Sequence, residues 1–264
     1  MGDTKSTLPA PAVTVPPVKL NLTGVSKIYS SGTQAVEALE PVNLQIRAGE
    51  FVIFFGPSGC GKSTLLNIIA GFEDVTEGEV SLDGSPVEGP HHDRLMMFQE
   101  HGLFPWLNVI QNVMFGLKRQ FRFKPKARRK HARQFLQMVH LGEFEHASIH
   151  ELSGGMKQRV ALARALAPDP KVLLVDEPFG ALDALTRAKL YVDLQEIHQR
   201  TGKTIILVTH DPREAACLGD RVLVFSSRPG RVKADISISL PRPRDINDPL
   251  VAECAAGIMA QLET

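Results

Sequence analysis

The stretch from 51 to 64 reads FVIFFGPSGCGKST. Its first five residues form a wholly apolar run, which is typical of a strand buried on both faces of a sheet. The next eight fit the pattern G-x-x-x-x-G-K-[ST], and residues 65–70 continue with helical character. Glycines let the backbone curl so that N–H groups point inward, and the start of the following helix adds positive partial charge. The stretch therefore predicts a cradle for the phosphates of a nucleotide.

Two side chains of this motif have a predicted chemical role. The Lys62 ammonium is expected between the β- and γ-phosphates, and the Ser63 hydroxyl is suited to ligate Mg²⁺. The expected nucleotide contacts are Gly56, Pro57, Ser58, Gly59, Cys60, Gly61, Lys62, Ser63 and Thr64. The motif alone does not choose among kinases, GTPases and motor ATPases, and a glycine-rich turn that carries a lysine remains the structural alternative.

Short apolar strands alternate with helical stretches along most of the chain. Alternating or wholly apolar runs predict strands at 18–29, 42–46, 51–55, 79–82, 95–98, 172–175, 205–208, 222–225 and 232–240. Helical patterns fall at 65–70, 109–117, 126–140, 155–167, 184–200 and from 246. This order favours an α/β class with a mainly parallel sheet.

The composition bounds the organisation of the chain. Its 264 residues, of which 43% are hydrophobic, allow one large domain. We expect a flexible tail over 1–17, a main domain over 18–245 with a helical lobe inserted at about 100–170, and a helical tail over 246–264. Lys plus Arg is 30 and Asp plus Glu is 29, so the overall charge gives no reason to expect nucleic-acid binding.

Cysteines and hydropathy bear on the compartment. Cys60, Cys217 and Cys254 are widely spaced and match no metal or disulfide pattern, which favours free thiols in a reducing compartment. No apolar run approaches the roughly 20 residues that cross a bilayer, so work at a membrane requires other chains to cross it. The N-terminus lacks a basic start followed by an apolar stretch, which argues against a signal peptide.

A second predicted strand ends in two acids, because residues 172–177 read VLLVDE. Strand ends beside a phosphate-binding loop are where a parallel sheet binds its ligands. Asp176 is expected in the Mg²⁺ shell, and Glu177 is the natural base or polariser for an attacking water. The alternative is a solvated acidic turn after a core strand.

A second helix start suited to anions lies at 152–159, LSGGMKQR. Ser153 is placed to cap the helix, and Gly154 and Gly155 fall in its first turn. Glycine costs about 1 kcal/mol relative to alanine in a helix, so this choice favours close approach by a ligand. One chain needs only one triphosphate cradle, and we expect this surface to cover ATP bound by another copy. A flexible loop is the alternative.

In this order the motifs resemble those of ABC-transporter ATPase subunits, from about 18 to 240. The LSGG sequence before a basic helix is specific to that family, although Met156 stands where the commonest signature has Gln. The resemblance implies the P-loop NTPase fold of ABC ATPases, a mainly parallel core with an antiparallel β subdomain and an inserted helical lobe.

The resemblance also implies further site residues. Tyr29 matches the aromatic residue that stacks on adenine, and Gln99 matches the glutamine that reaches Mg²⁺ and water. Asp183, in the loop 180–183, would signal across a dimer. His210 matches the histidine that touches the γ-phosphate and orients Glu177. Taken alone, the tyrosine could simply end a strand and the histidine could be structural.

The expected activity is hydrolysis of Mg-ATP by in-line attack of water, with positioning and charge neutralisation carrying the catalysis. Each ATP would lie between the P-loop of one subunit and the 153–155 helix start of a second, in a homodimer or a pair of paralogues. A transmembrane permease would be contacted near residues 99–106, where the only tryptophan, Trp106, lies in an apolar segment. Packing of that segment within the helical lobe is the alternative.

Two further sequence features carry a weaker signal. Residues 118–133 hold nine Lys and Arg residues, for which we favour a solvated helix face over contact with nucleic acid or anionic lipid. The segments RLMMFQEH at 94–101, PWL at 105–107 and LPRPR at 240–244 resemble the bacterial branch that serves nitrate, sulfonate and taurine importers.

That branch implies import of a small anionic solute delivered by a periplasmic or extracellular binding protein. It also implies a peripheral position on the cytoplasmic face of the inner membrane, and no nucleic-acid partner. The alternatives are an ABC subunit for another substrate such as a lipid, a soluble ABC ATPase of translation or DNA repair, or a non-ABC P-loop enzyme such as a kinase.

Overall fold

The computed structural model describes residues 15–31, 34–98, 102–117, 124–180 and 182–263. Its strands are β1 (Val18–Ser31), β2 (Gln34–Arg47), β3 (Phe51–Phe55), β4 (Glu77–Leu82), β5 (Ser85–Pro86), β6 (Arg94–Met97), β7 (Val172–Asp176), β8 (Thr204–Thr209), β9 (Arg221–Phe225) and β10 (Val232–Ser237). Its α-helices are α1 (Lys62–Ala70), α2 (Val109–Leu117), α3 (Pro125–Met138), α4 (Gly154–Leu166), α5 (Ala184–Thr201), α6 (Pro212–Leu218) and α7 (Pro249–Glu263). Two 3-10 helices, η1 (Gly142–Phe144) and η2 (Ile149–Glu151), lie between α3 and α4.

The strands form two sheets. One has four strands in the order β2-β1-β4-β5 and is antiparallel. The other has six in the order β10-β9-β3-β8-β7-β6, and all its neighbours are parallel except the β9–β10 pair. The mainly parallel core and the antiparallel second sheet that were expected from the resemblance are therefore present.

Strand β3 lies inside the six-stranded sheet and is buried along its whole length. Phe51, Ile53 and Phe55 face a core that they share with helices α2 to α7. Val52 and Phe54 face a second core, made with α1 and the antiparallel sheet. An unbroken apolar run is the pattern that a strand covered on both faces requires.

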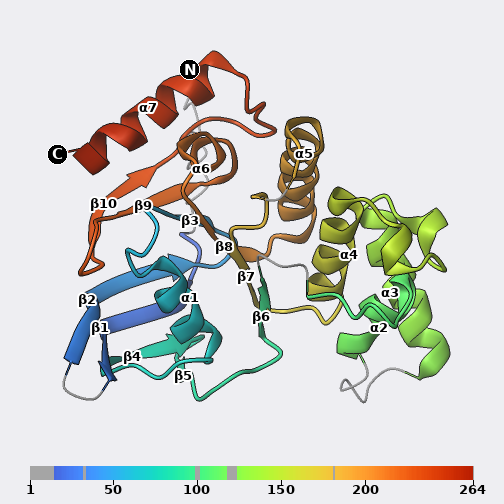
Figure 1. Ribbon diagram of the computed structural model, residues 1–264, viewed down its shortest axis with the longest axis horizontal. Coiled ribbons are helices and arrows are strands. Elements are labelled where there is room, and N and C mark those ends of the chain that lie inside the picture. The colour runs from blue at the N-terminus through green and yellow to red at the C-terminus, as the bar shows by residue number, and fades with distance from the viewer. Residues whose placement is uncertain (1–14, 32–33, 99–101, 118–123, 181, 264) are drawn as a thin grey trace, which may run out of the picture.

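The helices divide between these two cores. Figure 1 shows α1 between the two sheets, and α2, α3 and α4 together at the side of the molecule beyond β6. Helices α2 and α3 each pack on α4, which in turn contacts β6 and α5. Helix α7 packs on α6, β9 and β10. The P-loop, residues 56–61, connects β3 to α1 and therefore lies where the two sheets meet (Figure 1).

Element ends differ from the predictions where local geometry intervenes. Helix α3 ends at Met138 rather than at 140, because the chain turns at His140 with φ 58°. Helix α7 starts at Pro249 rather than at 246, because the Asp248 side chain accepts a hydrogen bond from the Leu250 amide. Strand β10 stops at Ser237, since the next amide, of Ile238, bonds outside the strand to Asp220.

Four short elements were not predicted, namely β5, α6, η1 and η2. Of these, α6 had a signal in the sequence. Asp211 caps it through hydrogen bonds from the Arg213 and Glu214 amides, and Pro212 occupies its first position. Among the helices described, none is long and apolar enough to span a bilayer.

Candidate functional site

The P-loop connects β3 to α1. Helix α1 begins after Gly61, which has φ 87° and makes no side-chain cap. The first amides of α1 therefore remain available to a ligand. Lys62 is 4% exposed, and its ammonium donates to the carbonyls of Gly56 and Pro57, each at 2.7 Å. The ammonium thus lies within the loop that the motif predicted as a phosphate cradle.

Two strand ends bring oxygen ligands to the same loop. Asp176 ends β7, and the Ser63 hydroxyl donates to its carboxylate at 3.1 Å. Burial raises the pKa of Asp176, and the hydrogen bond from Ser63 opposes that effect. Hydroxyl and carboxylate oxygens are the hard ligands that Mg²⁺ prefers.

Glu177 and His210 lie next to each other beyond the ends of β7 and β8. His210 Nδ1 is 3.3 Å from Glu177 Oε2. Glu177 has φ 39°, a left-handed conformation that is uncommon for a residue other than glycine. The arrangement leaves the histidine in position to orient the carboxylate.

Lys62, Ser63 and Glu177 line one cavity of about 320 Å³. Gly56, Pro57 and His210 line an adjacent cavity of about 700 Å³, and Asp176 lines neither. From the sequence predictions the smaller cavity gathers Tyr29, Ser58, Gly59, Gly61, Lys62, Ser63, Thr64 and Glu177. Residues of β2 and Arg228 also line it and were not predicted. A cavity with an amide cradle, a lysine and nearby carboxylates can hold a nucleoside triphosphate and position water against it.

Tyr29 lies near the end of β1, at the edge of this cavity. Its side chain is 40% exposed, and its hydroxyl donates to the Glu73 carboxylate. The Lys27 ammonium is 5.1 Å from the ring centroid. Burial and the bond to Glu73 raise the pKa of Tyr29, in spite of an opposing hydrogen bond from Thr64. The ring is therefore accessible for the stacking expected of it.

The start of α4 does not line this cavity. Ser153 caps α4 by accepting a hydrogen bond from the Met156 amide at 3.3 Å, as predicted, and both Ser153 and Gly154 are exposed. Gly155 is buried, and a Cβ atom there would lie 2.2 Å from Cγ2 of Thr186. The expectation that ligand approach explains both glycines is therefore incomplete, because packing of α4 on α5 already requires glycine at 155.

Asp183 caps α5, with its carboxylate accepting from the Thr186 amide at 3.0 Å. This hydrogen bond lowers the pKa of Asp183. The cap holds an exposed carboxylate at the tip of α5. Gln99 and Ala181 lie outside the described residues, as do Glu100 and His101.

A buried hydrogen-bond network behind the site was not predicted. The Glu214 carboxylate accepts from the Tyr191 hydroxyl at 2.6 Å and from the Thr209 hydroxyl at 2.5 Å. Burial raises the pKa of Glu214. The Tyr191 ring packs edge-on against Phe179, two residues beyond Glu177. The network thus connects the strand end before His210 with the segment after Glu177.

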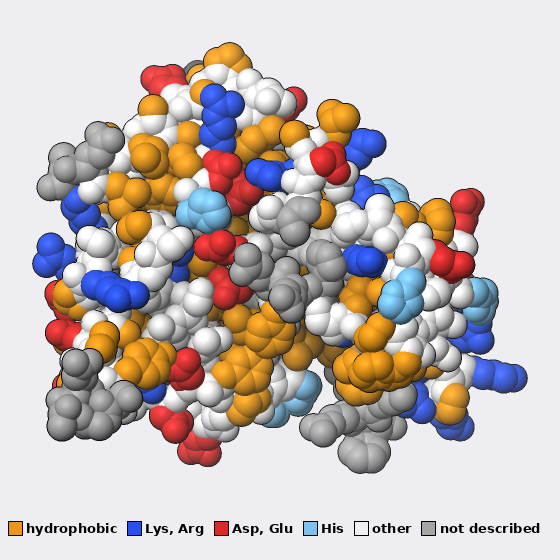
Figure 2. Space-filling view, in the orientation of Figure 1, with side chains coloured by type: hydrophobic (Ala, Val, Ile, Leu, Met, Phe, Trp, Pro, Cys, Tyr) orange, Lys and Arg blue, Asp and Glu red, His pale blue; other side chains and the backbone are white. Residues whose placement is uncertain are grey.

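A large apolar groove lies between β6 and the helices beyond it. It has a volume of about 960 Å³, and its lining includes Phe72, Phe98, Phe104 and Phe115. Figure 2 shows hydrophobic side chains gathered on this face, over β6 and over the region of α2. Arg164 of α4 donates to the Gly102 carbonyl at 2.7 Å, which ties the groove wall to that helix.

Trp106 lies close to this groove with 75% of its surface exposed. Its ring centroid is 5.5 Å from that of Phe104, which lines the groove. The alternative of packing within the helical lobe holds for part of the segment: Leu103 packs against the core and Phe104 against Phe115 of α2, whereas Trp106 is exposed. In the described part of the basic stretch, Arg129 and Arg133 pair with Glu145.

A phosphate-binding loop between β3 and α1, with acidic residues at the end of a nearby parallel strand, defines a P-loop nucleoside triphosphatase. Residues 39–180 match the family described as ABC transporter. The taurine import ATP-binding protein TauB of Burkholderia pseudomallei is 49% identical over 232 residues, which cover 88% of this chain and 89% of TauB. The nitrate import ATP-binding protein NrtD of a Synechocystis species is 48% identical over 222 residues, covering 84% of this chain and 83% of NrtD.

A solved structure agrees with these sequence matches. It is the dimeric post-hydrolysis state of the ATP-binding cassette MJ0796 bound to ADP and Pi, with a TM-score of 0.73 and 36% identity. The alignment covers 84% of this chain and 100% of that one. The chain belongs to the ABC transporter family, and its ABC ATPase fold is confirmed. It binds ATP and hydrolyses it to ADP and phosphate.

Proposed function

We propose that this ATPase powers the import of a small anionic solute through separate membrane subunits. The similarity to a taurine import and a nitrate import ATP-binding protein, each over more than four fifths of this chain, supports an anion carrying sulfonate or nitrate-like oxygens. The chain would lie at the cytoplasmic face of the inner membrane as a peripheral subunit. A periplasmic or extracellular binding protein would deliver the solute.

In the proposed site, the P-loop amides and Lys62 bind the phosphates. Ser63 and Asp176 fit a Mg²⁺ ion, because their oxygens lie 3.1 Å apart beside the loop. In the described part of the chain, no three His, Cys, Asp or Glu side chains gather as a metal site, so the nucleotide would supply further ligands. The ion would neutralise phosphate charge, and Tyr29 would stack on adenine.

Hydrolysis in this proposal depends on Glu177 and His210. The Glu177 carboxylate accepts a hydrogen bond from the attacking water and aligns it with the γ-phosphate. His210, 3.3 Å from that carboxylate, holds it in place and donates toward the γ-phosphate. Gln99 is assigned to the water and the metal from the family resemblance alone.

A second copy is proposed to complete each site. Ser153 and Gly154 are exposed at the start of α4 and do not line their own chain's cavity, which supports a role toward ATP bound by a neighbour. Gly155 follows in the same turn, and Asp183 would signal between the copies. The dimer in the solved ADP-bound cassette supports this arrangement. ATP would then hold the dimer closed until hydrolysis.

The groove lined by Phe72, Phe98, Phe104 and Phe115 is the proposed seat for a short helix of the permease. Three of these side chains, Phe72, Phe98 and Phe115, are 44–49% exposed, and large exposed apolar patches mark interaction sites. Trp106 beside the groove would serve as an anchor, since interface energy concentrates in aromatic residues.

One observation carries this proposal: Lys62, Ser63 and Glu177 line one cavity, and the Ser63 hydroxyl donates to the Asp176 carboxylate beside it. Its test is purification of the subunit from native membranes with its partner chains, followed by reconstitution in vesicles. We expect ATP supplied on the side of this subunit to drive uptake of taurine or nitrate. Recovery of ribosomes or DNA in place of membrane subunits would contradict transport. Uptake of a different solute would contradict only the proposed substrate class.

A further inference from the structure

We propose that Arg228 is a second cation of the nucleotide site, which binds the polyphosphate of ATP together with Lys62. This inference rests on the proposed P-loop site and adds a residue that lies far from the P-loop in sequence. The Arg228 Nε atom donates to the carbonyl of Gly59, inside the P-loop, at 3.2 Å. Arg228 is exposed and lines the same cavity as Lys62 and Glu177.

The turn that carries Arg228 is fixed against the P-loop. The Gly230 amide donates to the Ala38 carbonyl at 3.1 Å, and the Gly230 carbonyl accepts from the Glu40 amide at 2.9 Å. A Cβ atom at 230 would lie 2.1 Å from the Cys60 carbonyl oxygen, so only glycine fits between β2 and the loop. The Ser226 amide closes the turn by donating to the Arg231 carbonyl at 3.0 Å.

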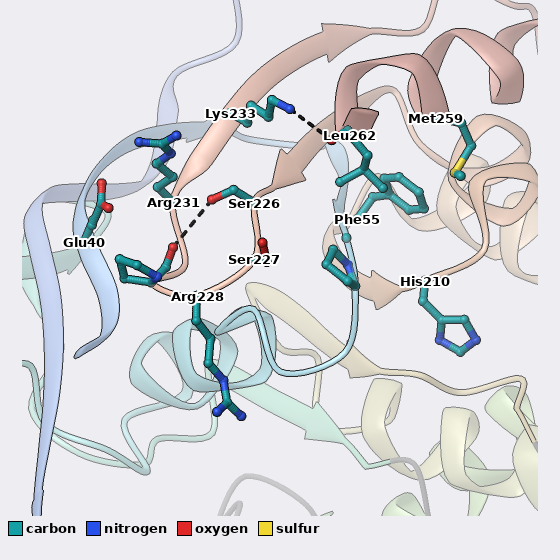
Figure 3. Close-up of a pocket in the computed structure, with 13 residues that line it drawn as sticks. Glu40, Phe55, His210, Ser226, Ser227, Arg228, Arg231, Lys233, Met259 and Leu262 are labelled. Carbon is teal, nitrogen blue, oxygen red and sulfur yellow. Dashed lines mark hydrogen bonds between the residues drawn. The ribbon is translucent and has the colours of Figure 1, made fainter. Parts of the chain in front are cut away.

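The Arg228 side chain extends in a different direction from the two nearby cations, Arg231 and Lys233 (Figure 3). In Figure 3, Arg228 extends toward the P-loop and α1, whereas Arg231 and Lys233 lie on the other side of the β9–β10 hairpin. Lys233 is engaged with the Leu262 carbonyl at 3.0 Å. Arg231 and Lys233 line only the adjacent cavity of about 700 Å³, whereas Arg228 lines both cavities. Arg231 is therefore a matched control on the same turn.

Charge balance gives Arg228 a reason to contact phosphate. Among the described residues that line the nucleotide cavity, the cations are Lys62 and Arg228 and the carboxylates are Glu37 and Glu177. Without Arg228 these side chains would sum to a negative charge facing a polyanion. A guanidinium is planar and can bind two phosphate oxygens at once. Rotation of the side chain away from the Gly59 carbonyl would free the guanidinium to bind phosphate.

The test measures binding of ATP, ADP, AMP and adenosine to the full-length protein by competition with a fluorescent ATP analogue. We expect Arg228→Gln to raise the Kd for ATP about tenfold, the weaker end of what a charged hydrogen bond contributes. The loss should shrink from ATP to ADP to AMP and vanish for adenosine. Arg228→Lys should keep part of the affinity, and Arg231→Gln should match wild type.

Two outcomes would overturn the assignment. One is a Kd for ATP within twofold of wild type in Arg228→Gln. The other is an equal loss for all four ligands, which would mean that Arg228 supports the fold of the whole site and does not act on the phosphates. Lys62→Ala serves as the reference for the P-loop itself. If both Lys62→Ala and Arg228→Gln bind ATP normally, the proposed nucleotide site is wrong. If Arg228→Gln binds ATP normally but Lys62→Ala does not, the site stands and only the role of Arg228 is wrong.

Discussion

Replacing Gly155 with alanine tests whether packing between α4 and α5 fixes the start of α4. The added Cβ would lie 2.2 Å from Cγ2 of Thr186, whereas carbon atoms pack best at roughly 3.5–4.0 Å. Either Thr186 must turn to another rotamer or one of the two helices must move by about 1.5 Å. Overpacking of this kind costs about 1–3 kcal/mol. Alanine returns up to about 1 kcal/mol through its higher helix propensity.

The middle of the overpacking range, about 2 kcal/mol, less up to about 1 kcal/mol from helix propensity, leaves an expected loss of about 1–2 kcal/mol in the free energy of unfolding for Gly155→Ala. For a chain of this size it corresponds to a fall in melting temperature of about 2–8 °C. Thr186→Ser is the matched rescue variant, because it removes Cγ2. The nearest side-chain atoms left at 186, Cβ and Oγ, would then lie 3.6 Å and 3.9 Å from the added Cβ at 155. The double variant Gly155→Ala/Thr186→Ser should recover most of the lost stability.

Urea unfolding of the wild type, the two single variants and the double variant gives the coupling energy directly. An unchanged unfolding midpoint in Gly155→Ala, or no recovery in the double variant, would refute the packing argument. ATPase rates are measured on the same samples. Full recovery of ATPase together with stability would remove Gly155 from the proposed contact with a neighbour's ATP and leave Ser153 and Gly154 to make it.

Three further predictions concern catalysis, coupling and acid stability. Glu177→Gln should abolish phosphate release while ATP still binds and a dimer accumulates, as seen by size-exclusion chromatography with ATP; wild-type turnover would remove Glu177 from its role. Trp106→Ala should impair transport in vesicles yet change unfolding by no more than about 0.5 kcal/mol, because the side chain is 75% exposed. A loss of ATP affinity as large as that of Lys62→Ala would contradict this. Hydrogen bonds from Arg133 hold the pKa of Glu145 down at about 2, against an ordinary 4.5. The pairing of ionised Glu145 with Arg133 therefore stabilises the fold above pH 4.5, and this stabilisation is lost as the pH falls toward 2. Urea midpoints should decline less over that range in Glu145→Gln than in wild type, and equal declines would refute the assignment.

Local sequence patterns predicted all strands but the two-residue β5, and the phosphate cradle, because the causes of these features are local. The run at 51–55 is apolar on both sides of its pleat, and it became β3 with those bounds. Residues 109–117 became α2 without any change of bounds. The end of β7 at Asp176 was likewise visible in the sequence as an apolar run closed by acids.

The features that the sequence did not predict depend on contacts between segments that are distant in the chain. Arg228 reaches the P-loop because β9 pairs with β3 in parallel, and nothing in the local pattern fixes that neighbour. Gly155 needs glycine because Thr186 lies against it, which only the packing of α4 on α5 reveals. Sequence distance hides such constraints, since strand order and helix packing arise only when the whole chain folds.

The buried contacts of Tyr191, Thr209 and Glu214 join α5 and α6 to the end of β8. Separating Tyr191 from Glu214 would strand a buried polar group, at a cost of about 1–3 kcal/mol or more. Helix α5, which begins after Asp183, is thus linked through Glu214 to Thr209, the residue before His210. A shift of α5 relative to the end of β8 would therefore break a buried hydrogen bond.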